Sequence, residues 1–354
     1  MPAPFISVLI DTYNHEAFIE QAIRSVLDQD FPAARREIIV VDDGSTDRTP
    51  DIVRQFEPQV RLIRKSNGGQ ASAFNAGISE CRGEIISFLD GDDWWTPDKL
   101  RRVVAELEKN PSLGSIGHGL FEAHSDGRPL GVVVPNQDTL LYLQDPQTAR
   151  RFTYFRAFLG TSRFTIRKKL LDRIFPIPEE LVIEADEYMF TLAPALAPAL
   201  VLNQPLFHYR LHPGNLYQYS NQDKIKARRK LSVLEALLLR LPPPLREFAV
   251  PEDIIAAVLE PIQIDSCRLR LSLDGGFPWE TFRIEKAAYA YSYSKRPLGH
   301  RLFSSLILAA TLALPPRLFY KLRQWYSEKK LHRLRGFIGI PTSAAPVIEH
   351  RPVS

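Results

Sequence analysis

The sequence is poor in cysteine and lacks any apolar run long enough to span a membrane. Cys81 and Cys267 are its only cysteines, too few for a disulfide framework or a four-thiolate zinc site, so a reducing cytoplasm is the expected compartment. The uncharged stretch 302–314 would extend only about 20 Å as a helix, short of the roughly 30 Å of a bilayer core. The first residues show no charged segment followed by an apolar run, so no secretory signal is expected.

The remaining composition is typical of a folded protein. The chain has 354 residues, of which 45% are hydrophobic and 24% charged, which excludes wholesale disorder and allows one large domain or two. Residues 1–110 contain 13 Lys and Arg against 19 Asp and Glu, a net charge of −6, so the remainder carries +10 to give the total of +4. The acidic first part argues against a dedicated nucleic-acid binder.

Strands and helices are predicted to alternate over the first 110 residues. Strands are expected at 5–10, 37–41, 60–63 and 84–89, and helices at 18–27, 52–56, 70–79 and after Thr96, which is the expected cap. This order predicts an α/β fold with a mostly parallel sheet and helices on both faces. Further on, strands are expected at 113–121 and 130–134 and helices at 188–200 and 222–240.

Polar side chains follow three of the predicted strands, at residues 11–14, 42–45 and 90–93. Parallel strands end at one rim of a sheet, where such folds bind ligands. The three carboxylates of residues 90–93 repel one another unless a cation neutralises them, and Mg²⁺ or Mn²⁺ takes oxygen ligands and bridges diphosphates. The alternatives are an acidic turn at 90–93 and a capped strand-to-helix turn at 42–45.

Four motifs together resemble those of family 2 glycosyltransferases. They are residues 7–14 (SVLIDTYN), 41–47 (VDDGSTD), 67–69 with 75–77 (NGG, NAG) and 88–93 (FLDGDD), in the order and spacing of the family. The resemblance covers residues 5–215. It implies a GT-A fold of the nucleotide-diphospho-sugar transferase type, a divalent cation (Mg²⁺ or Mn²⁺) as cofactor, and inversion at the anomeric carbon.

The resemblance also implies roles for individual residues. The implied nucleotide-sugar-binding residues are Thr12, Tyr13, Asp43, Asn75, Asp90 and Arg210, and the implied metal ligands are Asp92 and His212. The chain departs from the family at Asp11, where the family more often has proline.

The family further requires a catalytic base, typically in a Glu-Asp pair at the start of a later helix. The stretch 183–190 matches and puts Asp186 at the base position, with Glu184 and Glu187 as alternatives because Ala185 replaces the usual Glu. A positioned carboxylate would take the proton of an attacking hydroxyl. An acidic helix N-terminus favoured by the helix dipole is the structural alternative.

The basic second half predicts a separate extension. The expected divisions are a catalytic domain over 1–220, a helical extension over 221–335 and a flexible tail over 336–354. Seven cations with interleaved aromatic residues follow the apolar stretch 302–314; they are Arg317, Lys321, Arg323, Lys329, Lys330, Arg333 and Arg335. This pattern suits peripheral contact with an anionic membrane, and packing on the catalytic domain is the alternative.

The leading hypothesis is a metal-dependent, hexosyltransferase-like enzyme that adds one sugar to a glycan or lipid-linked acceptor in cell-envelope or extracellular glycan synthesis. It would act at the inner face of the cell membrane. A polymerase is not expected, because Gln324-Trp325 lacks the spacing of the Gln-x-x-Arg-Trp motif of processive members. A degenerate nucleotide-sugar binder is supported only by Ala185. A sugar nucleotidyltransferase would need a glycine- and arginine-rich loop where this chain has residues 12–14.

Overall fold

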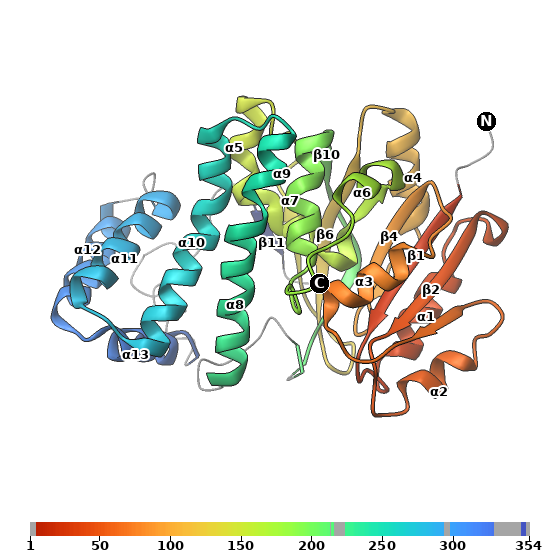
Figure 1. Cartoon of the computed structure of the whole chain (residues 1–354), viewed down its shortest axis with the longest axis horizontal. Coiled ribbons are helices and arrows are strands. Elements are labelled where there is room, and N and C mark those ends of the chain that lie inside the picture. The colour runs from red at the N-terminus through yellow and green to blue at the C-terminus, as the bar shows by residue number, and fades with distance from the viewer. Residues whose placement is uncertain (1–4, 213, 216–223, 294–297, 329–347, 352–354) are drawn as a thin grey trace. The chain divides into compact units, whose positions relative to one another are not determined.

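The computed structural model describes residues 5–212, 214–215, 224–293, 298–328 and 348–351 (Figure 1). Contacts divide the described chain into two compact units. The first is drawn from residues 1–214, 240–255 and 347–354, and the second from residues 215–239 and 256–346.

The first unit is built on an 11-stranded mixed sheet. Its strands are β1 (Ile6–Thr12), β2 (Arg36–Asp42), β3 (Arg61–Arg64), β4 (Ile85–Asp90), β5 (Trp94–Trp95), β6 (Ser115–His124), β7 (Pro129–Pro135), β8 (Thr139–Leu141), β9 (Thr165–Arg167), β10 (Ala199–Leu211) and β11 (Ile348–Arg351). Strands β3, β2, β1 and β4 are parallel neighbours, whereas β9, β6, β7 and β11 continue the sheet through antiparallel pairs. The parallel part carries the predicted motifs.

Helices cover both faces of this sheet. Those of the first unit are α1 (Ile19–Leu27), α2 (Thr49–Arg54), α3 (Gln70–Ile78), α4 (Lys99–Lys109), α5 (Pro146–Phe155), α6 (Lys168–Ile174), α7 (Asp186–Leu196) and α9 (Pro242–Glu247). Val8 and Ile10 are fully buried in one core cluster with α1 and α4. Leu9 points to the other face, where Gly77 of α3 lies so close that a Cβ on it would be 2.2 Å from a Leu9 methyl. The predicted α/β architecture is confirmed.

Two predictions about helix ends need correction. The helix expected over 188–200 ends at Leu196, and β10 begins at Ala199. Pro198 disfavours helix in the residue before it, and pairing of β10 with β6, β5 and β8 decides in favour of a strand. Thr96 is not the cap of α4, because the helix begins at Lys99 and the Thr96 hydroxyl donates to Asp98 Oδ1 (2.9 Å).

Within the segment expected to be a flexible tail, Ile348–Arg351 forms β11, which pairs antiparallel with β7. The edge strand β7 offers unpaired N–H and C=O groups to which a further strand can bond. The composition of the tail does not predict this pairing. Residues 336–347 and 352–354 of that expected tail lie outside the described residues.

The predicted C-terminal helices are present. They are α8 (Lys224–Arg240), α10 (Glu252–Asp274), α11 (Pro278–Tyr293), α12 (Leu298–Ala313) and α13 (Pro316–Glu328). In the second unit, Phe319 and Tyr320 of α13 pack with Leu271 of α10 in a small core. No helix in the described part of the chain is long and apolar enough to cross a membrane.

Candidate active site

The ends of β1, β2 and β4 meet at one rim, as predicted from their polar residues. Asp11 lies opposite Asp90 in the β1–β4 register, and Thr12 lies opposite Asp42 in the β1–β2 register. The N–H of Gly91 donates to the Asp11 carbonyl (2.9 Å). The three polar clusters therefore form one acidic site.

Asp11 and Asp90 form a carboxylate pair at this rim. The Oδ1 atom of Asp11 is buried and accepts no hydrogen bond from the described residues. Burial, followed by the charge of Asp92, raises the pKa of Asp11 to about 8. Burial and then the charge of Asp11 raise the pKa of Asp90 well above its usual range. Such a pair must share protons or meet a cation.

Asp11 is expected to make the stability of the metal-free protein pH-dependent. The folded protein holds a proton on Asp11 that the unfolded chain releases near pH 3.8, so its contribution to stability falls as pH rises from about 4 to about 8. Asp11→Asn should therefore stabilise the protein in EDTA by roughly 3–4 kcal/mol more at pH 8 than at pH 5, since each pH unit between the two pKa values is worth about 1.4 kcal/mol. Urea denaturation of parent and variant at both pH values measures this difference. An equal effect at both values would contradict the raised pKa.

Asp92 lies between two histidines. Its Oδ2 is 2.9 Å from His212 Nε2 and 3.9 Å from His15 Nε2. Burial opposes ionisation of Asp92, but the charge of His15 and the hydrogen bond of His212 outweigh it and lower its pKa. The N–H of Gly214 donates to His212 Nδ1 (3.2 Å), which assigns the proton to Nε2 and makes His212 the donor to Asp92. The structure thus brings together the two residues predicted as metal ligands.

Arg210 holds this acidic loop from inside the protein. It is 3% exposed; its backbone N–H donates to Asp93 Oδ1 (3.0 Å) and its Nε donates to the Asp92 carbonyl (2.8 Å). Its guanidinium lies over the Trp94 and Phe18 rings, 4.4 and 4.7 Å from their centroids. The described bonds of this side chain position the loop that carries Asp92. The predicted nucleotide-sugar contact of Arg210 stays a prediction.

A stack of rings supports the same loop. His208 lies between Trp94 and Phe121, with ring centroids 4.6 and 4.7 Å away, and burial followed by the charge of Arg210 lowers its pKa to about 4. A neutral imidazole therefore completes a stack that ends at Arg210.

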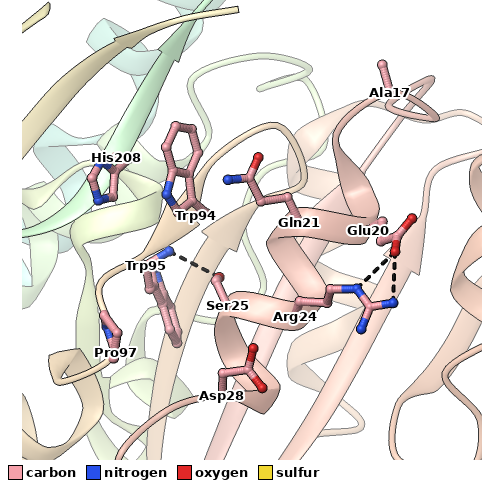
Figure 2. A pocket seen from close by; sticks show the side chains of 10 residues that line it. All are labelled: Ala17, Glu20, Gln21, Arg24, Ser25, Asp28, Trp94, Trp95, Pro97 and His208. Carbon is pink, nitrogen blue, oxygen red and sulfur yellow. Dashed lines mark hydrogen bonds and ion pairs between the residues drawn. The ribbon is translucent and has the colours of Figure 1, made fainter. Parts of the chain in front are cut away.

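A pocket of about 560 Å³ lies beside this stack (Figure 2). It is lined by Ala17, Glu20, Gln21, Arg24, Ser25, Asp28, Trp94, Trp95, Pro97 and His208. None of the residues predicted to bind nucleotide-sugar or metal lines it. Two lining residues connect it to the acidic site: Trp94 directly follows Asp93, and Gln21 Oε1 accepts a hydrogen bond from Arg210 (2.5 Å).

Asp43 organises a glycine loop beside the rim. Its carboxylate accepts hydrogen bonds from the N–H groups of Gly68 (3.0 Å) and Gly69 (2.8 Å) and from Lys65 Nζ (2.7 Å). Gly44 has a φ of 79°, and a Cβ there would lie 2.6 Å from the Asn67 nitrogen. Glycine is required at this close approach of two loops.

The other residues predicted to bind the nucleotide-sugar differ in exposure and in their contacts. Tyr13 is 43% exposed at the rim, and Thr12 is 3% exposed with its hydroxyl 3.2 Å from His15 Nδ1. Asn75 instead ties α3 to a distant segment, because its side-chain amide donates to the Ile177 carbonyl (2.8 Å) and accepts from the Ile177 N–H (2.9 Å). These two bonds give Asn75 a structural role, and its predicted contact with the nucleotide-sugar stays a prediction.

Asp186 begins α7, and its Oδ2 accepts hydrogen bonds from the N–H and hydroxyl of Thr161 (2.9 and 3.0 Å). Burial raises its pKa, and these two donors oppose the shift. Ala185 is fully buried, and its N–H donates to Gln70 Oε1 (2.9 Å). Glu187, one of the alternative bases, forms an ion pair with Arg156.

The comparisons with known proteins indicate one family. The sequence model described as glycosyl transferase family 2 matches residues 7–175, just under half of the chain. Over this segment the chain is similar to glycosyl transferase family 2. The matched segment contains all four motifs of the rim.

Relatives of the chain include the glycosyltransferase alr2836 of Nostoc sp., 32% identical over 59% of this chain and 66% of the relative. EpsJ of Bacillus subtilis is 31% identical over 60% of this chain and 63% of its own length. TuaG of the same organism, whose name refers to teichuronic acid biosynthesis, is 35% identical over 39% of this chain and 56% of its own length. The matches thus span less than two thirds of each relative.

Solved structures confirm the GT-A fold of the chain. TarS of S. aureus superposes with a TM-score of 0.54 at 21% identity, over 80% of this chain and 49% of TarS. The mannosyltransferase PcManGT of Pyrobaculum calidifontis, in complex with GDP-Man and Mn²⁺, gives 0.51 at 20% identity, over 92% and 85% of the two chains.

A bridge that sequence reasoning missed joins the two acidic parts of this site. Thr161 holds Asp186, and the next residue, Ser162, donates from its hydroxyl to Asp93 Oδ2 (2.7 Å) and accepts from the Asp90 N–H (3.1 Å). Two consecutive residues therefore fix the candidate base relative to the acidic loop. Residues 159–166 carry no periodic pattern that would have revealed this role.

Lys99 supports this bridge from below. It is fully buried, its Nζ donates to the Ser162 carbonyl (2.9 Å), and the same Nζ lies 3.6 Å from the centroid of a Trp95 ring. Burial lowers the pKa of Lys99 well below its usual range, and the charge of Asp93 opposes the shift. The sequence signal was its helical register, because Lys99 precedes the buried Val103 and Leu107 by four and eight residues.

Ser162→Ala should destabilise the protein by about 1–3 kcal/mol, because it leaves the buried Asp90 N–H and the Asp93 carboxylate without this partner. Urea denaturation in EDTA measures the change. Ser79→Ala is the control, since Ser79 is exposed and its hydroxyl bonds only within its own helix end (2.9 Å to the Ala76 carbonyl). Equal midpoints for the two variants would contradict the bridge.

The side chains at the rim supply some of the ligands that a divalent cation needs. Among the described residues, no group of three or more His, Cys, Asp and Glu side chains is arranged to hold a metal ion. Asp92 and His212 nevertheless offer one oxygen and one nitrogen side by side, next to the orphaned Oδ1 of the Asp11–Asp90 pair. Such a site suits an ion that takes further ligands from phosphate oxygens and water.

Proposed function

We propose that this protein transfers one sugar from a nucleotide-diphospho-sugar to an acceptor hydroxyl, with inversion of configuration. One observation carries the proposal: the Thr161–Ser162 bridge ties the carboxylate of Asp186 to the acidic loop formed by family motifs. The teichuronic acid name of TuaG supports a cell-envelope or extracellular glycan as the product. The protein would work in the cytoplasm at the inner face of the membrane, in peripheral contact with anionic lipid.

The donor would bind at the rim of β1, β2 and β4. Tyr13, 43% exposed, would contact the base, Asp43 holds the glycine loop that would surround the base, and Asp90 would lie beside the ribose and diphosphate. Thr12 completes the wall between them. Each of these roles is inferred from position on the rim and from the family motifs.

Asp92 and His212 would hold Mg²⁺ or Mn²⁺; the structure of PcManGT, which has the same fold, is named as a complex with Mn²⁺. A bound divalent cation offsets the negative charge that develops on a leaving nucleoside diphosphate. Arg210 contributes indirectly, because it fixes the backbone of Asp92. Lys99 also contributes indirectly, because its Nζ donates to the Ser162 carbonyl beside the same loop.

Asp186 would act as the general base. It would accept the proton of the acceptor hydroxyl as that oxygen bonds to the anomeric carbon, while the bond from that carbon to the diphosphate oxygen breaks. Because configuration inverts, no carboxylate nucleophile is needed. The two donors from Thr161 keep Asp186 oriented and counteract the effect of burial on its pKa; a positioned base contributes roughly 10²–10⁴-fold.

The test is product formation from a panel of nucleotide-diphospho-sugars, with Mn²⁺ and with EDTA. Binding of nucleoside diphosphates, read as thermal stabilisation, is measured on the same samples. Transfer that requires Mn²⁺ supports the proposal. Binding without transfer or donor hydrolysis across the panel would favour the degenerate binder that Ala185 suggests.

A further inference from the structure

Three apolar side chains form an exposed stripe on α13 of the second unit. Leu318, Leu322 and Trp325 are 44%, 47% and 52% exposed. They follow one another at intervals of four and three residues, so they lie on one face of the helix. We call these three residues the apolar stripe.

The opposite face of α13 is anchored, so the stripe has a defined direction. Phe319 and Tyr320 are each 5% exposed in the core with Leu271. The Tyr320 hydroxyl donates to Glu285 Oε1 (3.2 Å), and Arg323 forms an ion pair with the other oxygen of Glu285 (2.6 Å). Because these contacts fix the helix from inside the unit, the stripe stays on the outer surface.

Cations accompany the stripe. Lys321 and Arg317 are exposed on the same helix, and residues 316–335 contain seven Lys and Arg against one Glu. Indole rings prefer the interface between headgroups and acyl chains, and clustered cations are attracted to anionic lipids. With 13 residues, α13 is too short to span a bilayer but long enough to lie in its surface.

We propose that the apolar stripe is a docking surface for an anionic membrane, with α13 parallel to the bilayer. The charge pattern favours lipid over a second copy of this chain, because a two-fold contact through the stripe would bring Lys321 and Arg317 close to their own counterparts. Protein interface cores are also depleted of lysine. This inference rests on the membrane contact proposed above and identifies the surface that makes it. Its test does not depend on sugar transfer.

The experiment is flotation of the full-length protein with vesicles of phosphatidylcholine, alone or mixed with phosphatidylglycerol. The parent should float with the anionic vesicles and less so at high salt. The variant Leu318→Ser/Leu322→Ser/Trp325→Ser should lower vesicle partitioning about tenfold or more. Leu130→Ser/Leu140→Ser is the matched control, because both leucines are 40% exposed on strands of the first unit and net charge is unchanged; it should float like the parent.

Point substitutions are preferable to a deletion of the tail, because a deletion would remove Phe319 and Tyr320 from the core with Leu271. If the triple variant fails to fold, Lys321→Glu decides, since it should weaken binding to anionic vesicles and reduce its salt dependence. Equal flotation of parent and stripe variant, or no flotation of the parent, overturns the proposal. So does light scattering that shows a parent dimer dissociated by the stripe variant, which would make a second copy the occupant.

Discussion

Asp186→Asn is expected to lower turnover by about 10²-fold or more while leaving nucleotide-sugar affinity nearly unchanged. Asparagine has the shape of aspartate and keeps an oxygen for the two Thr161 donors, so the start of α7 should be preserved. It cannot accept the proton of an acceptor hydroxyl. Steady-state turnover with the donor found active in the panel, together with calorimetric donor affinity, measures the two effects separately.

Two neighbouring carboxylates are the controls for this prediction. Glu184→Gln and Glu187→Gln remove the charges that flank Asp186 in sequence, and Glu187 is already paired with Arg156. Both variants should retain most of the turnover. A large loss in either of them with an active Asp186→Asn would move the base by one or two residues, and would leave the donor site as proposed.

Asp92→Ala should weaken nucleoside diphosphate binding in Mn²⁺ by about 100-fold or more, since even an indirect partner of a metal ligand is worth 10–100-fold. The fold should survive, because removal of this carboxylate relieves its repulsion of Asp11, Asp90 and Asp93. Calorimetry with UDP and GDP, in Mn²⁺ and in EDTA, measures the affinity, and urea denaturation measures the stability.

Asp126→Ala is the matched control for Asp92→Ala. Asp126 is an exposed carboxylate that pairs with Arg128, so its loss changes the net charge equally and should leave nucleotide affinity unchanged. The metal role of Asp92 is refuted if Asp92→Ala binds UDP and GDP in Mn²⁺ as tightly as the parent. A loss of affinity that is equally large in EDTA would point to a structural effect on the loop.

The sequence by itself determined the parallel part of the sheet and the location of its rim. Short apolar runs alternating with amphipathic helices can form only a few architectures, and strand ends bring residues 11–14, 42–45 and 90–93 together whatever the rest of the chain does. Local pattern is sufficient here because β1, β2 and β4 are largely buried on both faces, and α1 and α4 each have a clear apolar side. The family motifs then indicated Asp92, His212 and Asp186.

Tertiary structure alone decided how these residues are held. Asn75 and Arg210 carry polar groups that suit a ligand, but the fold engages them with the backbone of Ile177 and Asp92. Thr161 and Ser162 have no sequence pattern of their own, yet they join Asp186 to Asp90 and Asp93. The physical reason is range: these hydrogen bonds link residues far apart in the chain, and a buried polar group takes whichever partner the fold brings to it. The paired edge of β7 and the outward direction of the apolar stripe were decided in the same way.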